Sequence, residues 1–260
     1  MYNKAYRCAY PNSIFYSLIS VLAAACSSPR IATVDEDQEF RRASISADSI
    51  LSAIPDYSLS LKTIEGKGKA IVSEPGNTER VTVYFSGNRQ KSLVTIKNTL
   101  GIEGGQILSE GDSLLVYNKV DKIAHRISVR DDQMTSVQHL ASVNILKMMN
   151  FVPQADRVKN VYESQDRYLL LLETGAEVFV DKNGFNVRRV DQPRSTGLPY
   201  SRIIYEAYGS IGGFNLPRRV TIFSADAQSK VALLIQSLEV NPGNLDLEID
   251  LPNDVKFVTQ

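Results

Sequence analysis

The sequence has few of the residues that carry metal or redox chemistry. Its 260 residues include two cysteines, two histidines and no tryptophan, and the histidines, His125 and His139, stand apart. Neither a disulfide framework nor a histidine-rich metal site can be built from so few residues. The motifs GxSxG and HExxH are absent, and the glycines of residues 101–105 lie between predicted strands, whereas a phosphate loop must open a helix. The sequence therefore predicts no catalytic, cofactor or metal site, and we expect a protein that is not an enzyme.

The chain also lacks an excess of charge of either sign. It carries 29 Lys+Arg against 29 Asp+Glu. Nucleic-acid binders need clustered cations that neutralise phosphates, so we expect no nucleic-acid partner. Apolar residues make up 43% of the chain and charged residues 22%, which is close to the globular average. The chain can therefore bury a core.

Both cysteines lie near the start of the chain, in a segment typical of export signals. Lys4 and Arg7 provide a basic beginning, no acidic residue precedes Asp35, and residues 13–25 (SIFYSLISVLAAA) form an apolar run. A helix that spans a bilayer needs about 20 residues, and this run is shorter. Residues 1–25 are therefore predicted to be a cleaved signal peptide.

The end of that segment, Leu22-Ala-Ala-Ala-Cys26-Ser27, resembles the lipobox of bacterial lipoproteins. The resemblance predicts that cleavage leaves Cys26 as a lipidated N-terminus, whereas the alternative is an ordinary secretory cut. Several acyl chains such as palmitate, at about 0.8 kcal/mol for each buried methylene, hold a protein stably at a membrane. Ser27 after the cysteine implies the outer membrane, and the lack of an acidic cluster directly after Ser27 favours its periplasmic face. Loss of Lys4 and Arg7 leaves 27 basic residues against 29 acidic ones, a net charge of minus two.

The rest of the chain divides into a tether and a domain. Residues 26–45 are polar and are predicted to be a flexible tether, and residues 46–260 form the domain. Ser46 is placed to cap a short helix that Pro55 ends. From Tyr57 onward, apolar and polar residues alternate in short runs separated by turn residues, which predicts a mainly β fold with an antiparallel meander. The predicted strands, about a dozen, cover residues 57–61, 81–85, 94–96, 106–108, 113–118, 122–129, 158–163, 168–173, 177–181, 186–191, 202–208, 218–223 and 230–240.

One helical segment interrupts the strands at residues 132–151. Its apolar residues fall on one stripe, with Asp131 or Asp132 available as the cap, and it forms either one helix or two short ones. We expect it to lie across the open face of a curved sheet. The residues that would cover that face are Met134, Val137, Leu140, Ala141, Ile145 and Met148.

Two of the predicted strands are apolar on both faces, at residues 168–172 and 231–235. This pattern fits a fully covered central strand. It fits equally a sheet whose inner face lines an apolar cavity, and the composition does not separate the two.

Residues 92–119 resemble the strand, Leu-Gly loop, strand, turn and strand of the LolA/LolB lipoprotein-carrier superfamily. The likeness rests on Leu100-Gly-Ile-Glu103 between two strands, and it continues in residues 213–222, residues 231–240 and Leu251-Pro252. Within the superfamily, the chain is similar to a LolB-like branch of outer-membrane lipoproteins.

The resemblance implies a half-open antiparallel β-barrel of about 11–12 strands, lidded by short helices, with a hollow that binds acyl chains. The helical stripe would then be the lid of an acyl cavity. Leu100 matches the apolar tip of a membrane-insertion loop, with Gly101 permitting the turn and Ile102 as a second membrane-facing residue; the alternative is that Leu100 and Ile102 fold back into the core. The implied partners are acyl chains of lipoproteins or other lipids, a LolA-like periplasmic carrier and the membrane, and we expect a monomer.

Two functions follow as hypotheses. The first is a lipid-anchored protein that binds acyl chains and helps receive or insert lipoproteins into the outer membrane; the sequence does not separate lipoprotein chains from a phospholipid or glycolipid. The second is a non-catalytic accessory or scaffold lipoprotein of the cell envelope, which uses the same fold with a filled core.

Overall fold

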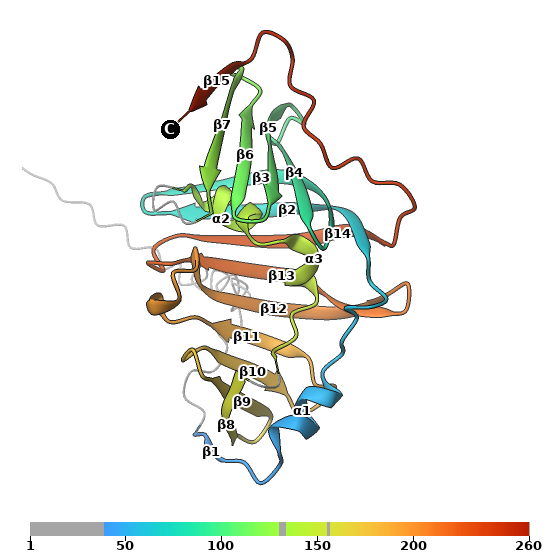
Figure 1. Ribbon diagram of the computed structural model, residues 1–260, viewed down its shortest axis with the longest axis vertical. Coiled ribbons are helices and arrows are strands. Elements are labelled where there is room, and N and C mark those ends of the chain that lie inside the picture. The colour runs from blue at the N-terminus through green and yellow to red at the C-terminus, as the bar shows by residue number, and fades with distance from the viewer. Residues whose placement is uncertain (1–38, 130–133, 155–156, 260) are drawn as a thin grey trace, which may run out of the picture. The chain divides into compact units, whose positions relative to one another are not determined.

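Alternating apolar residues fold most of the chain into one sheet of fifteen strands (Figure 1). The computed structural model describes residues 39–129, 134–154 and 157–259. The predicted signal peptide, Cys26, most of the predicted tether, Asp131 and Asp132 lie outside the described residues. Residues from Phe40 onward belong to one compact unit. The strands are β1 (Arg41–Arg42), β2 (Thr63–Glu74), β3 (Asn77–Asn88), β4 (Lys91–Lys97), β5 (Glu103–Glu110), β6 (Ser113–Asn118), β7 (Ile123–Ser128), β8 (Val158–Glu163), β9 (Arg167–Leu172), β10 (Glu177–Asp181), β11 (Val187–Asp191), β12 (Tyr200–Ile211), β13 (Phe214–Ser224), β14 (Lys230–Val240) and β15 (Lys256–Thr259).

The order of strands in the sheet is β1-β8-β9-β10-β11-β12-β13-β14-β2-β3-β4-β5-β6-β7-β15. Neighbours are antiparallel except for β15, which runs parallel to β7. The pairing of β14 with β2 joins the two halves of the chain, and the sheet is not closed between β1 and β15. The prediction of a mainly β, half-open antiparallel barrel is therefore confirmed, although the sheet contains more strands than the 11–12 expected.

The strand that sequence patterning missed at the centre of the sheet is β2. Its inward positions include Gly66 and Gly68, which weaken the apolar alternation and are poor strand residues. A Cβ on Gly66 would lie 2.5 Å from a ring carbon of Phe85, and one on Gly68 would lie 2.7 Å from the carbonyl oxygen of Leu234. Neighbouring strands approach too closely for any side chain, so the glycines are required by the packing.

Residues 57–61, which were predicted to be a strand, instead form a turn. The amides of Ser60 and Leu61 donate to the carbonyl of Tyr57 at 3.1 and 2.8 Å, and the Ser58 amide donates to Asp56. These local hydrogen bonds compete with strand pairing. Leu59 is left 91% exposed at the turn.

In the described part of the chain, the sheet is accompanied by three helices, α1 (Ala47–Ala53), α2 (Ser136–Ser142) and α3 (Ile145–Met149), together with a 3₁₀ turn, η2 (Arg194–Thr196). Helix α1 begins at Ser46 as predicted, because the Ser46 side chain accepts from the Ser49 amide. The periodic segment forms two short helices, one of the two outcomes expected. Their caps are Thr135 and Asn144 rather than the predicted Asp131 or Asp132.

Helix α2 lies against strands from both halves of the sheet. It contacts β2, β4, β5, β6, β13 and β14, and five strands separate β13 from β6 in the sheet order. The sheet must therefore curve around α2, which places the helix on the concave face (Figure 1).

Candidate functional site

The first candidate site is the apolar interior between the sheet and helices α2 and α3. Four of the predicted lid residues are buried there, with exposures of 8% or less: Met134, Ala141, Ile145 and Met148. Val137 is half-buried against the same cluster, and the side chain of Leu140 lies outside the described part of the chain. The structure brings the described lid residues together with inward side chains such as Val83, Val94 and Ile107. Whether they close an acyl cavity stays a prediction.

Helix α3 is fixed to its surroundings by side-chain hydrogen bonds. The Asn144 amide group donates to the carbonyl of Asn88 at 2.9 Å, and the Ile145 amide donates to Ser92 Oγ at 3.0 Å. At the other end, Asn150 Oδ1 accepts from the Tyr57 amide at 2.8 Å, and Asn150 Nδ2 donates to the carbonyl of Pro55 at 2.9 Å. These bonds tie α3 to the β3–β4 hairpin and to the segment after α1.

Helix α2 makes a different kind of contact. Its capping box is internal, with Thr135 Oγ1 accepting from the Gln138 amide and Gln138 Oε1 accepting from the Thr135 amide. The ring of His139 lies near the carbonyl of Pro199, and its Nδ1 is buried with no hydrogen-bond partner among the described residues. Burial lowers the pKa of His139, and the nearby Asp226 and the Pro199 carbonyl partly oppose that shift. The described side chains of α2 that pack against the core cluster, Val137 and Ala141, are apolar.

The second candidate site is the loop between β4 and β5. Leu100 is 83% exposed and Ile102 is 59% exposed, so neither folds back into the core. Asn98 Oδ1 accepts from the amides of Leu100 and Ile102 at 3.0 and 2.9 Å, and Gly101 adopts a φ of +83° that suits glycine. The predicted loop residues therefore form a structured, exposed tip. Membrane insertion by this tip stays a prediction.

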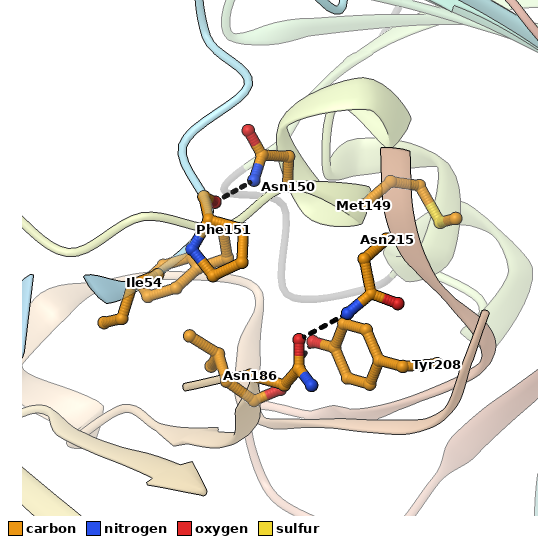
Figure 2. Close-up of a pocket in the computed structure, with 9 residues that line it drawn as sticks. Ile54, Met149, Asn150, Phe151, Asn186, Tyr208 and Asn215 are labelled. Carbon is orange, nitrogen blue, oxygen red and sulfur yellow. Dashed lines mark hydrogen bonds between the residues drawn. The ribbon is translucent and has the colours of Figure 1, made fainter. Parts of the chain in front are cut away.

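A small polar pocket lies where α1 and α3 end near β11, β12 and β13 (Figure 2). Its volume is about 20 Å³, which is enough for about one water molecule. Asn215 Nδ2 donates to Asn186 Oδ1 at 2.9 Å, and Tyr208 donates to the carbonyl of Val187 at 2.6 Å. Burial raises the pKa of Tyr208. The pocket is too small for an acyl chain and serves as a polar joint between the helices and the sheet.

Tyr205 is a residue that sequence reasoning missed. It is 1% exposed within the core cluster, and its hydroxyl has no hydrogen-bond partner among the described residues. Burial raises the pKa of this hydroxyl well above its ordinary value. Buried polar atoms usually have partners, so an unpaired one marks a candidate ligand contact. The sequence feature that could have placed Tyr205 in the core is its position two residues after Ile203, on the inward side of the same strand.

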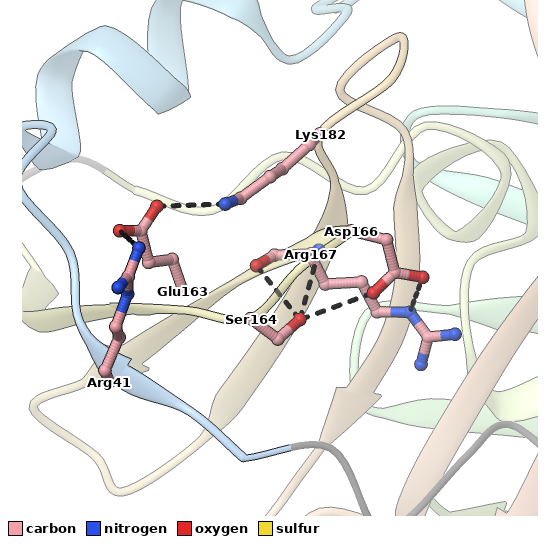
Figure 3. Close-up of polar contacts among 6 residues, drawn as sticks. All are labelled: Arg41, Glu163, Ser164, Asp166, Arg167 and Lys182. Atoms are coloured by element: carbon pink, nitrogen blue, oxygen red, sulfur yellow. Dashed lines mark hydrogen bonds and ion pairs between the residues drawn. The ribbon is translucent and has the colours of Figure 1, made fainter.

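A group of polar side chains fixes β1 at the edge of the sheet (Figure 3). Glu163 on β8 pairs with Arg41 at 3.4 Å and with Lys182 at 2.9 Å. The hydrogen bond from Lys182, together with the charges of Lys182 and then Arg41, lowers the pKa of Glu163, and burial partly opposes that shift. Arg41 and Arg42 fall within the predicted tether, so the last part of that segment is paired to the sheet.

Metal-ligating side chains do not gather in the described residues, where no group of three or more His, Cys, Asp or Glu could hold a metal ion. No described helix has both the length and the apolar composition needed to cross a bilayer.

Solved structures share with this chain an open antiparallel sheet curved around short helices. A LolA superfamily protein from Nitrosomonas europaea is similar over 76% of this chain and 94% of its own, with a TM-score of 0.54 and 16% identity. A putative outer membrane lipoprotein-sorting protein domain from Vibrio parahaemolyticus is similar over 77% and 96%, with a TM-score of 0.53 and 12% identity. A DUF1329 family protein from Desulfovibrio piger is similar over 77% and 94%, with a TM-score of 0.53 and 12% identity. No family model matches the sequence, and no curated protein matches it.

Proposed function

We propose that this protein is a lipid-anchored outer-membrane lipoprotein, facing the periplasm, that binds acyl chains under α2 and helps to receive or insert lipoproteins. The observation that carries the proposal is the LolA-like sheet, whose concave apolar face is covered by α2 mainly through apolar contacts. Cys26 would supply the anchor, and a LolA-like carrier would supply the cargo.

Transfer of this kind needs no enzyme, and we propose that the protein is not one. Burial of apolar surface is favourable by roughly 25 cal/mol per Å², so each more apolar site along the route draws the acyl chain forward. The bilayer is the final and most extensive apolar site. The protein then acts by binding the acyl chain in its apolar interior and releasing it to the bilayer.

The scaffold function remains a second candidate, because one observation favours it. Met134, just before α2, and Ala141 within it are buried, and α2 contacts six strands, so α2 occupies the concave face in this structure. For an acyl chain to enter, α2 must move away from the sheet. A scaffold would keep it in place.

Bound lipid distinguishes the two functions. We would purify the full chain from membranes in a mild detergent, wash it, and identify co-purifying lipids by mass spectrometry. A carrier is expected to retain acylated lipid in a fixed ratio to protein. A protein that retains no lipid at any detergent concentration that preserves the fold would be a scaffold.

A transfer assay tests the loop. Leu100→Glu should slow transfer of an acylated lipoprotein from a loaded carrier to liposomes about tenfold or more, because burying a leucine contributes about 1.5–3 kcal/mol and 1.4 kcal/mol is a factor of ten. Leu59→Glu is the matched control, since Leu59 is at least as exposed as Leu100 but belongs to the turn before β2. Equal transfer by the two variants would show that the loop has no such role.

A further inference from the structure

A second exposed apolar tip lies beside the β4–β5 loop. The turn between β6 and β7 carries Val120, which is 73% exposed. The amide of Lys119 in this turn donates to the carbonyl of Gly104 at 3.0 Å, and Lys119 Nζ pairs with Glu103 at 3.3 Å. The two tips are therefore neighbours at one end of the sheet, and together they present Leu100, Ile102 and Val120 to solvent.

The two tips share one construction. Asn98 precedes Leu100 by two residues, and its side-chain oxygen accepts from the amides of Leu100 and Ile102. Asn118 precedes Val120 by two residues, and its side-chain oxygen accepts from the amides of Val120 and Asp121 at 3.0 and 3.1 Å. In both turns an asparagine satisfies the backbone donors of the apolar residue at the tip.

This construction matters because a bilayer offers no hydrogen-bond partners. A backbone N–H that enters lipid unpaired is strongly penalised, which is why membrane-embedded backbone satisfies its polar groups internally. Leu100, Ile102 and Val120 meet that requirement before any contact with lipid. Leu59 does not, although it is 91% exposed, because its amide has no acceptor among the residues the structure describes.

Basic side chains surround the second tip. Lys119 is paired with Glu103, and Lys122 is paired with Asp254, so both ammonium groups are held at the base of the turn. The long stems of lysines let their charges lie at the level of lipid phosphates while an adjacent apolar residue enters deeper.

We propose that the β4–β5 and β6–β7 tips form one two-pronged surface that contacts the lipid bilayer, with Leu100 and Ile102 on one prong and Val120 on the other. The inference deepens the proposed function and rests on it only in naming the membrane as the partner. Contacts at two adjacent hairpins fix the angle between the sheet and the bilayer, with this end of the sheet facing the lipid. A single loop would leave that angle free to change.

The absence of tryptophan from the chain permits a direct test. The full chain carrying Leu100→Trp, Val120→Trp or Leu59→Trp would be reconstituted into vesicles of phosphatidylcholine and phosphatidylglycerol, with and without brominated acyl chains. We expect a blue shift of emission and loss of intensity to bromine at positions 100 and 120, and neither at position 59. Quenching at 100 alone would overturn the second prong, and a blue shift at 120 that bromine does not quench would indicate a protein contact instead.

Two further variants separate this surface from lipid binding inside the protein. Asn118→Ala in the Val120→Trp chain leaves the apolar tip in place but frees two amides, so bromine quenching at position 120 should fall. Unchanged quenching would overturn the argument from satisfied donors. Val120→Asp should weaken vesicle contact while the lipid recovered by mass spectrometry stays the same, because Val120 lies outside the core cluster. Circular dichroism and thermal melting check that each variant is folded.

Discussion

Helices α2 and α3 come from one periodic segment of sequence but are attached to the sheet in different ways. Four of the five residues of α3 are buried, and side chains at both of its ends hydrogen-bond other elements. Helix α2 touches six strands, and its described side chains that pack against the core cluster, Val137 and Ala141, are apolar. Apolar contacts are non-directional, and the same contacts could be made with an acyl chain.

The difference identifies which helix can move. Hydrogen bonds with fixed partners hold α3 in one place, whereas α2 can leave the sheet and leave few buried polar groups unpaired. Elements that move during function are usually those of low local stability. We therefore expect α2 to open while α3 stays in position, and the following experiments test that contrast.

The largest effect is expected for Leu146→Ala in α3. Leu146 is fully buried, and removing a buried leucine side chain lowers the free energy of unfolding by about 2–5 kcal/mol. Val137→Ala in α2, where the side chain is half-buried, should lower it by about 1 kcal/mol. Urea unfolding of both variants measures the difference. Equal losses would show that α2 is as firmly attached as α3.

Asn150→Ala removes the bonds that tie α3 to the segment after α1. The Tyr57 amide and the Pro55 carbonyl would lose their partners, which should lower the free energy of unfolding by about 1–3 kcal/mol. Hydrogen exchange should speed up at Tyr57 and in α3 and stay unchanged in α2. Faster exchange throughout α2 would mean that the two helices open together.

Tyr205→Phe addresses the interior that both helices cover. The variant loses only a hydroxyl that has no described partner, so the lipid-free protein should become more stable by about 1 kcal/mol. If the hydroxyl contacts the carbonyl of a bound acyl chain, the same variant should retain less lipid. Thermal melting and lipid analysis on one preparation measure both quantities. A loss of stability would show that the hydroxyl already has a partner in the lipid-free protein.

The smallest effect is expected from the titration of His139 on α2. Burial lowers its folded-state pKa below the unfolded value of about 6.5, so the unfolded state binds the proton more readily. The stability present above the unfolded pKa is therefore lost as pH falls through that value towards the folded pKa. Asp226 opposes the shift and keeps the loss small. His139→Gln should lose less stability than the parent chain between pH 7 and pH 5, measured by urea unfolding, and equal losses would contradict the assignment to His139.

Most of the fold could be predicted from the sequence because most strands from β3 to β14 either alternate apolar and polar residues or form short apolar runs, and turn residues separate them. Strand β2 could not, because the need for glycine at positions 66 and 68 comes from Phe85 and Leu234 on neighbouring strands. The turn at residues 57–61 alternates like a strand, yet Asp56 and the Tyr57 carbonyl satisfy its amides locally. Alternation of apolar and polar residues predicts a strand only where no nearby acceptor takes the hydrogen bonds of the backbone amides.

The candidate site was predictable to a similar extent. The lid residues with described side chains are buried or half-buried in the core cluster, and Leu100 is exposed in its loop, while their roles in acyl binding and membrane insertion stay predictions. Tyr205 and Val120 were not recognised, since the significance of each depends on its neighbours. Tyr205 matters because no described residue hydrogen-bonds its hydroxyl, and Val120 because pairing between β5 and β6 sets its turn beside the β4–β5 loop.

The pairing of β14 with β2 also governs the order in which the protein can fold. Lys230 pairs with Ser73 and Val240 pairs with Ile64, so the centre of the sheet joins residues from distant parts of the chain. Such non-local pairing is slow, and a chain interrupted before Lys230 would expose unpaired edges on both β2 and β13. Neither half of the sheet is complete until residues 230–240 have been synthesised, so the nascent chain keeps these edges unpaired until β14 is available.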